Sequence, residues 1–180
     1  MRTARLLAAG ALALLAGCQP SPPASSTAGA AAAPPPLLPK PQASTIALMT
    51  GVIAPTSDAI WQAMPASDKD WADLRYKVLL MAEAANLLAV PDRPGLLPGE
   101  KLASPAGPGD LSPEQSAEKI KAEWPTYLAY AQTLQNGAMA TLKAVDSKDA
   151  DALVEAGGAI YEACEQCHKR FWYPNAPAAP

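Results

Sequence analysis

The chain has 180 residues, 20 of them proline and 11 glycine, which is enough for one domain with tails rather than two domains. Hydrophobic residues make up 49% of the chain but include a single phenylalanine, and the heavy use of alanine favours closely packed helices over a sheet. The net charge is -3, and no basic block or alternation of aromatic and basic residues is present to bind a phosphate backbone. Nucleic acid is therefore excluded as an expected partner.

Residues 1–17 are typical of a secretory leader. Arg2 and Arg5 precede an apolar run, residues 6–16, that is too short to span a bilayer. The segment ends in Leu-Ala-Gly followed by Cys18, which resembles a bacterial lipobox. The resemblance implies that Cys18 is acylated and becomes the new N-terminus, whereas the alternative is an ordinary cleaved leader followed by a free thiol. Removal of the leader leaves 12 basic and 17 acidic side chains, a net charge of -5.

Residues 18–43 are predicted to be a tether between this lipid anchor and the folded domain. Beyond Cys18 they are rich in proline, alanine and serine and carry one charge, Lys40. Such a segment cannot bury a core and is expected to be extended, at about 3.1 Å per residue. The resemblance to lipoproteins implies anchoring in a membrane on the side facing the periplasm. Gln19, in place of the aspartate that marks inner-membrane retention in that class, favours the outer membrane.

The first helical segment is expected to begin at Ser44 as N-cap and to stop at Pro65, with a kink or a break at Pro55. The second is expected to begin at Ser67, where Asp70 three residues later nearly completes a capping box, and to stop before Pro91. Helical spacing predicts the buried stripes, which are Ile46, Met49, Ile53 and Ile60 in the first segment, and Trp71, Leu74, Val78, Met81, Ala85 and Leu88 in the second.

Residues 91–112 are rich in proline and glycine and are predicted to connect two helix pairs. The third helix is expected to begin at Ser112, followed by Pro113 and Gln115, and to bend at Trp124-Pro125. Its buried stripe is predicted to contain Ile120, Tyr127, Ala131, Leu134, Ala138, Leu142 and Val145. The last helix is expected to begin near Ser147 or Asp149. Its buried stripe is predicted to contain Leu153, Gly157, Ile160, Cys164, Cys167 and Phe171, with His168 beside it.

Two cysteines and the only histidine of the chain lie within five residues, Cys164 to His168. The motif C-x-x-C-H is the attachment sequence for c-type haem. On a helix, residues three and four apart share a face, so both thiols and the imidazole can reach one flat ligand. The alternatives are a thioredoxin-like dithiol, which normally lies next to β-strands, and a structural zinc site, which needs four ligands.

These residues resemble the class II c-type cytochromes, the cytochrome c′ family, in which C-x-x-C-H lies on the last helix. The resemblance implies an all-α, antiparallel four-helix bundle over residues 44–173 with one haem c, followed by a disordered tail, residues 174–180. It makes Cys164 and Cys167 the thioether attachment points and His168 the proximal iron ligand. A homodimer is a further expectation, because class II bundles often dimerise.

A methionine on the first helix of that family gives a six-coordinate electron carrier, and Met49 stands on the expected inward stripe. Met49 is the first candidate for the sixth ligand, Met81 the second, and Met64 and Met139 are weaker. Methionine at such a position is more often ordinary core filling. Gly157 costs its helix roughly 1 kcal/mol against alanine, so either a neighbouring helix or the haem is expected to press there, and Ile160 is expected at the cofactor as well.

The expected function is one-electron transfer to redox partner proteins of the cell envelope, without catalysis, since no acid/base pair suited to transforming a substrate is apparent. A second hypothesis is a five-coordinate haem protein that binds nitric oxide or carbon monoxide. A third is a lipid-anchored helical scaffold whose C-x-x-C pair is a dithiol without haem.

Overall fold

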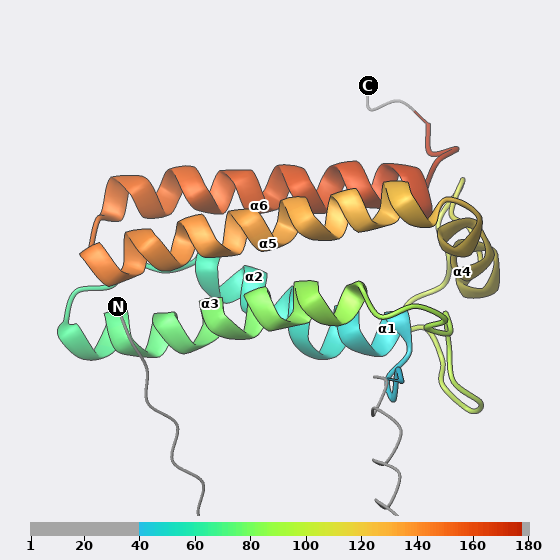
Figure 1. The fold of residues 1–180 in the computed structure, drawn as a ribbon, viewed down its shortest axis with the longest axis horizontal. Helices are drawn as coiled ribbons and strands as arrows, with labels where there is room; N and C mark the ends of the chain where they lie inside the picture. The colour runs from blue at the N-terminus through green and yellow to red at the C-terminus, as the bar shows by residue number, and fades with distance from the viewer. Residues whose placement is uncertain (1–39, 178–180) are drawn as a thin grey trace, which may run out of the picture. The chain divides into compact units, whose positions relative to one another are not determined.

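The computed structural model describes residues 40–177, and every regular element within that range is helical. The prediction of an all-α domain is therefore confirmed for these residues. The leader, Cys18 and residues 19–39 of the tether lie outside the described residues. In chain order the elements are α1 (Thr45–Leu48), the π-helix η1 (Met49–Ile53), α2 (Ala54–Trp61), α3 (Asp68–Leu88), α4 (Pro113–Ala122), α5 (Trp124–Ser147) and α6 (Ala150–Phe171) (Figure 1).

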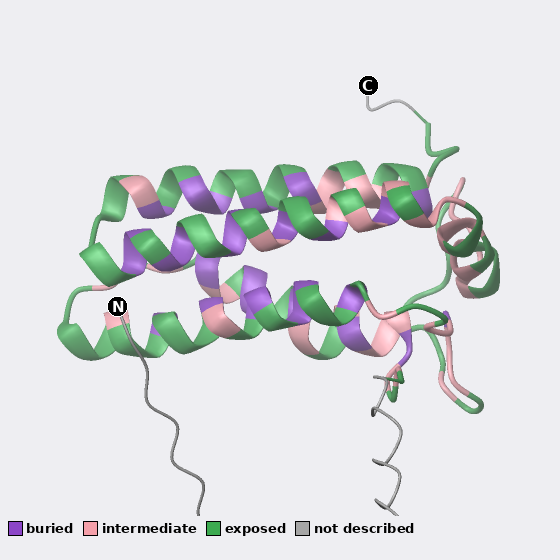
Figure 2. Ribbon diagram, in the orientation of Figure 1, coloured by how far each residue is buried: buried purple, intermediate pink, exposed green. Residues whose placement is uncertain are grey.

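The three long helices pack along their lengths, with α5 in contact with both α3 and α6 (Figure 1). The α2 helix packs against α3 and α6, and η1 also contacts α3. Figure 2 shows the buried residues on the helix sides that face one another. Between residues 40 and 177, no helix combines the length and the apolar character needed to cross a bilayer. The most completely buried core side chains include Val78, Met81, Ala138 and Ile160.

Pro55 does not break the first helical segment, so of the two predicted outcomes, a kink or a break, the break is absent. Helical backbone continues from α1 into α2, and the turn before Pro55 widens into η1, where the Ala54 N–H donates to the carbonyl of Met49, five residues earlier. Proline lacks an N–H and its ring crowds the preceding turn, and a wider turn accommodates both. The hydroxyl of Thr56 donates to Val52 O at 2.7 Å, and that of Ser57 donates to Ile53 O at 2.9 Å.

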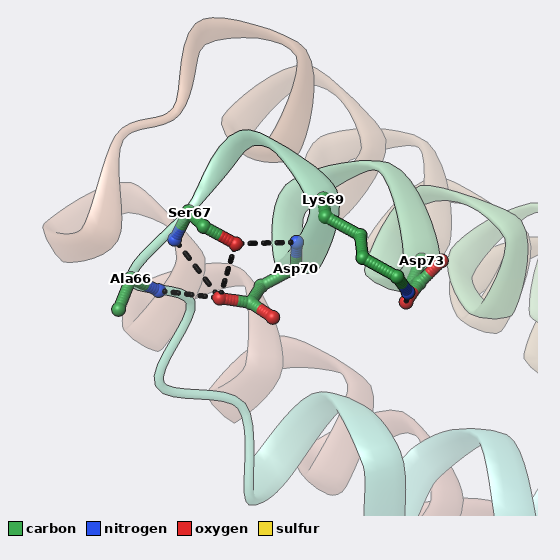
Figure 3. A network of polar contacts seen from close by, with 5 residues as sticks. All are labelled: Ala66, Ser67, Lys69, Asp70 and Asp73. Carbon is green, nitrogen blue, oxygen red and sulfur yellow. Dashed lines mark hydrogen bonds and ion pairs between the residues drawn. The ribbon is translucent and has the colours of Figure 1, made fainter.

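The start of α3 is the capping box that the sequence predicts (Figure 3). Ser67 Oγ accepts from the Asp70 N–H at 3.2 Å, and the Asp70 carboxylate accepts from the Ser67 N–H at 2.9 Å. The same carboxylate oxygen accepts from Ala66 N–H at 3.1 Å. These bonds and the Ser67 hydroxyl lower the pKa of Asp70. Lys69 and Asp73 form an ion pair one turn along the helix.

The third predicted helix is broken rather than bent. The capping box at Ser112 and Gln115 is present, but α4 ends at Ala122, and Glu123 adopts a non-helical conformation before α5 begins. Pro125 lies in the first turn of α5, where its missing N–H is not needed. The break turns α4 across the ends of α5 and α6, with which it is in contact (Figure 1). There Glu123 forms ion pairs with Lys119 at 2.7 Å and with Arg170 at 2.6 Å.

The connection between α3 and α4 has no helix, as predicted, but backbone hydrogen bonds tie it to other parts of the domain. Thr45 N–H donates to Pro94 O at 2.8 Å, and Leu111 N–H donates to Trp172 O at 2.7 Å. The turn at residues 174–176 lies close to Gly109, at which a Cβ would come within 2.5 Å of the Ala176 nitrogen. Both chain-terminal parts of the domain thus meet this loop.

Candidate functional site

The α6 helix brings Cys164, Cys167 and His168 to one cavity. The helix begins at the N-cap Asp149, whose carboxylate accepts from Ala152 N–H at 3.0 Å, and it continues without interruption to Phe171. Because the three residues are three and four apart, they reach the same side of its last turns. The other residues that line the cavity are Met49, Ile53, Leu88, Tyr127, Tyr130, Ala131, Leu134 and Ala163.

The two cysteines are free thiols, each half-buried. Burial raises the pKa of Cys164 to about 11 and that of Cys167 to about 12. At neutral pH both therefore remain protonated, and the thiolate, which is the nucleophile in disulfide exchange, is scarce. This environment disfavours the thioredoxin-like alternative, because redox-active cysteine pairs depend on a lowered thiol pKa.

Burial lowers the pKa of His168, with Glu165 opposing the shift. The imidazole is therefore neutral at neutral pH, which is the form that binds a metal ion. Trp172 lies edge-on to its ring at 5.1 Å between centroids. Tyr173 lies 6.1 Å from the same ring, and its hydroxyl donates to Glu165 Oε1 at 2.6 Å. The aromatic residues that follow α6 thus pack beside the imidazole.

Met49 is the one methionine within residues 40–177 that lines the cavity. Met81 is fully buried elsewhere in the core, where its sulfur lies 3.9 Å from the Thr56 hydroxyl oxygen. Met64 and Met139 are 92% and 50% exposed. The structure therefore brings the first candidate for the sixth ligand together with His168, and it places the other three candidates away from them.

Gly157 and Ile160 do not line this cavity. Gly157 lies against α2, where its carbonyl accepts from Trp61 Nε1 at 3.0 Å. Ile160 is fully buried against α5, and its Cγ1 would lie 3.1 Å from a Cβ at Gly137. The neighbouring helix at Gly157 is therefore α2, but a Cβ there would lie 3.6 Å from Trp61 Cδ1, an ordinary contact, so α2 does not require glycine at this position. Haem contact at either residue stays a prediction.

The residues around the cavity fit a covalently attached haem in their chemistry. Two thiols can form thioethers, a neutral imidazole can bind iron, and the remaining walls are apolar or aromatic, as cofactor sites in proteins generally are. The cavity volume is about 20 Å³, which is room for one water molecule. A porphyrin would therefore need the surrounding side chains to move apart. The zinc alternative requires a group of His, Cys, Asp or Glu side chains that can hold a bare metal ion. Within the described residues, no three such side chains are arranged in that way.

Several wall residues could not be identified from the sequence. Tyr127 falls on the predicted stripe of its helix, so its burial could be expected, but nothing marked it as a cofactor contact. Tyr130 is half-buried and lies off that stripe. Its ring stacks edge-on to Phe171 at 6.1 Å between centroids. A contact between α5 and the end of α6 depends on tertiary packing, which has no local signal.

No protein-family model, curated protein or solved structure matches this chain. The interpretation of the site therefore depends on the chain's own residues. Those residues are the two thiols, the imidazole and Met49 around a cavity with apolar and aromatic walls.

Proposed function

We propose that this protein is a c-type cytochrome of the class II, cytochrome c′-like type, which carries single electrons in the cell envelope. Cys164 and Cys167 would hold one haem c through thioethers, and His168 would be the proximal ligand. Met49 would be the sixth ligand. The haem, when bound, supplies an iron that cycles between the ferrous and ferric states.

The observation that carries this proposal is the convergence of Met49 with Cys164, Cys167 and His168 on one cavity. The four residues come from η1 and α6, and Met49 lies 115 residues before Cys164 in the chain. A C-x-x-C-H sequence alone predicts attachment. A methionine brought to the same cavity adds the axial ligand that favours a higher reduction potential.

The surroundings of the site suit electron transfer. The apolar walls formed by residues such as Ile53, Leu88 and Leu134 exclude water, and a rigid helix holds the imidazole in place. Trp172 is 46% exposed and its ring contacts that of His168, so it lies between the site and the protein surface. The proposed fold is an antiparallel four-helix bundle in which α1, η1 and α2 together act as the first helix.

The proposal also includes anchoring by acylated Cys18, with the domain facing the periplasm and the outer membrane favoured over the inner. Redox partner proteins of the envelope and a second copy of the chain are the proposed partners. Metabolic labelling with a fatty acid would test the anchor. Label in the wild-type protein and none in Cys18→Ser supports it, whereas unlabelled wild-type protein would contradict it.

Visible spectra of the mature protein, produced with haem-attachment machinery, test the central claim. We expect a c-type spectrum, a mass increase equal to one haem, and a methionine-to-iron charge-transfer band in the ferric protein. Met49→Ala should lose that band, and Met139→Ala, which changes an exposed methionine on α5, should keep it. A colourless protein with the mass of the acylated polypeptide alone would refute the proposal.

A second candidate function is the binding of nitric oxide or carbon monoxide at a five-coordinate iron. The observation in its favour is that Ile53 and Leu88, which cannot ligate iron, line the cavity together with Met49. A high-spin ferrous spectrum that shifts when carbon monoxide is added, and that is the same in Met49→Ala, would establish this function in place of electron transfer.

A further inference from the structure

A second and larger cavity adjoins the first. Its volume is about 500 Å³, within the range of about 300 to 1,000 Å³ that is usual for small-molecule sites. Leu88 and Tyr127 line both cavities. The walls come from the start of α1, the end of α3, the following loop, α4 and the start of α5. A flat ligand held at Cys164 and Cys167 that extends past these two shared side chains would enter the second cavity.

The second cavity is lined by Arg93, a cation whose hydrogen-bonding capacity is not fully used. Its Nη1 donates to Ala43 O at 2.7 Å and its Nη2 donates to Leu87 O at 2.6 Å, which fixes the guanidinium in place. Both acceptors are neutral carbonyls, and no carboxylate of residues 40–177 forms an ion pair with it. Its Nε is buried without a hydrogen-bond partner. A buried donor left without a partner is destabilising.

We propose that Arg93 is the cationic partner of a haem propionate, with the second cavity receiving the carboxylate edge of the porphyrin. This inference rests on the proposed function. A porphyrin of the haem type carries two carboxylates on one edge, and a guanidinium is the side chain best suited to bind a carboxylate through paired donors. The proposal gives a counter-ion to the half-buried charge of Arg93, with which no carboxylate of residues 40–177 forms an ion pair.

The charges around the cavity agree with one carboxylate at Arg93. The loop contributes Asp92 and Arg93, α4 contributes Glu118 and Lys121, and α5 contributes Tyr127, while the residues from α1 and α3 carry no charge. Asp92 in the loop and Glu118 and Lys121 on α4 are exposed, so solvent screens their charges. Tyr127 is buried and lines both the first cavity, with Cys167, and the second cavity, with Arg93. Tyr127 thus connects the thiol end of the site to Arg93.

The test is the pH dependence of the midpoint potential of the haem-loaded protein. Wild type, Arg93→Gln and Arg93→Lys are compared with Arg75→Gln, which removes an exposed arginine paired with Asp146 on the surface. A cation beside a carboxylate lowers its pKa by about 1–3 units. The inflection assigned to the propionate should therefore move to higher pH by about that amount in Arg93→Gln, and the potential at neutral pH should fall. Arg93→Lys should recover most of the shift, and Arg75→Gln should match wild type.

If the midpoint potential inflects at the same pH in all four proteins, the propionate contact is overturned and the proposed function is left intact. A protein without covalent haem would instead overturn the proposed function, and this proposal with it. A purely structural role of Arg93 predicts lower stability without a moved inflection. If Arg93→Gln does not fold, the propionate contact is tested by NMR in the unaltered protein, through the nitrogen resonance of Arg93 Nε. It should differ between ferric and ferrous states while that of Arg75 does not, and an unchanged Arg93 signal overturns the proposal.

Discussion

Gly157→Ala tests whether a helix or the cofactor occupies the space at this glycine. A Cβ at Gly157 would lie 3.6 Å from Trp61 Cδ1 and 3.7 Å from Ile60 Cγ2, which are ordinary van der Waals distances. Alanine is about 1 kcal/mol better than glycine inside a helix, and a newly buried methyl adds up to about 0.8 kcal/mol. We therefore expect the free energy of unfolding to rise by about 1.5 kcal/mol, or about 3 to 6 °C in Tm for a domain of this size.

The matched control is Gly158→Ala in the same turn of α6, where a Cβ would have no atom within 4 Å. It should gain about 1 kcal/mol from helix propensity alone. Urea unfolding followed by circular dichroism measures both variants, and the visible spectrum should equal that of wild type in each. If Gly157→Ala is less stable than wild type while Gly158→Ala gains, and its spectrum shifts, then the haem rather than α2 contacts Gly157, and the reasoning from the observed packing is wrong.

Two further changes test local features. Ser67→Ala removes the N-cap of α3 and should lower the free energy of unfolding by about 1 kcal/mol, measured in urea, and an unchanged midpoint would show that Asp70 alone sustains the cap. Glu123→Gln removes a carboxylate whose pKa the hydrogen bonds from Lys119 and Arg170 lower from its usual 4.5. The stabilisation from this charge is present above pH 4.5 and is lost as the pH falls through the lowered pKa. The stability difference between wild type and variant, followed by thermal unfolding from pH 7 to pH 3, should therefore shrink in acid, and a constant difference would contradict the ion-pair argument.

The features that the sequence predicted well are those encoded within a few residues. Both capping boxes, at Ser67 and at Ser112, were identified because a serine and the residue three positions later satisfy each other's backbone groups. The buried stripe of α3 followed from helical spacing in the same way. The common face of Cys164 and Cys167 is equally local, since helical geometry brings residues three apart together, whereas haem attachment to them stays a prediction.

The features that the sequence did not predict depend on competition between local and tertiary terms. Of the kink or break predicted at Pro55, the break is absent, because a π turn together with the hydroxyls of Thr56 and Ser57 keeps the helix continuous. Pro125 predicted a bend, but Glu123 leaves the helix and gains two cationic partners from other turns. Arg93 lies in a loop without periodicity, so no pattern could place it beside Tyr127.

The contrast between the two cavities leads to a prediction about the order of assembly. A cavity of about 20 Å³ beside Cys164 and Cys167 cannot admit a porphyrin, and burial keeps both thiols protonated. On the proposed function, thioether formation must therefore precede the packing of η1 and α5 against α6. Folded haem-free protein should attach haem much more slowly than the same protein unfolded in urea, when each is given reduced haem and attachment machinery that functions in urea. Leu134→Ala enlarges the cavity and should reduce the difference in attachment rate between folded and unfolded protein. Leu74→Ala removes a core leucine that does not line the cavity, and it should leave that difference unchanged. Equal attachment rates for the folded and unfolded wild-type protein would mean that the helices open freely around the site, and the closed cavity would then have no bearing on assembly.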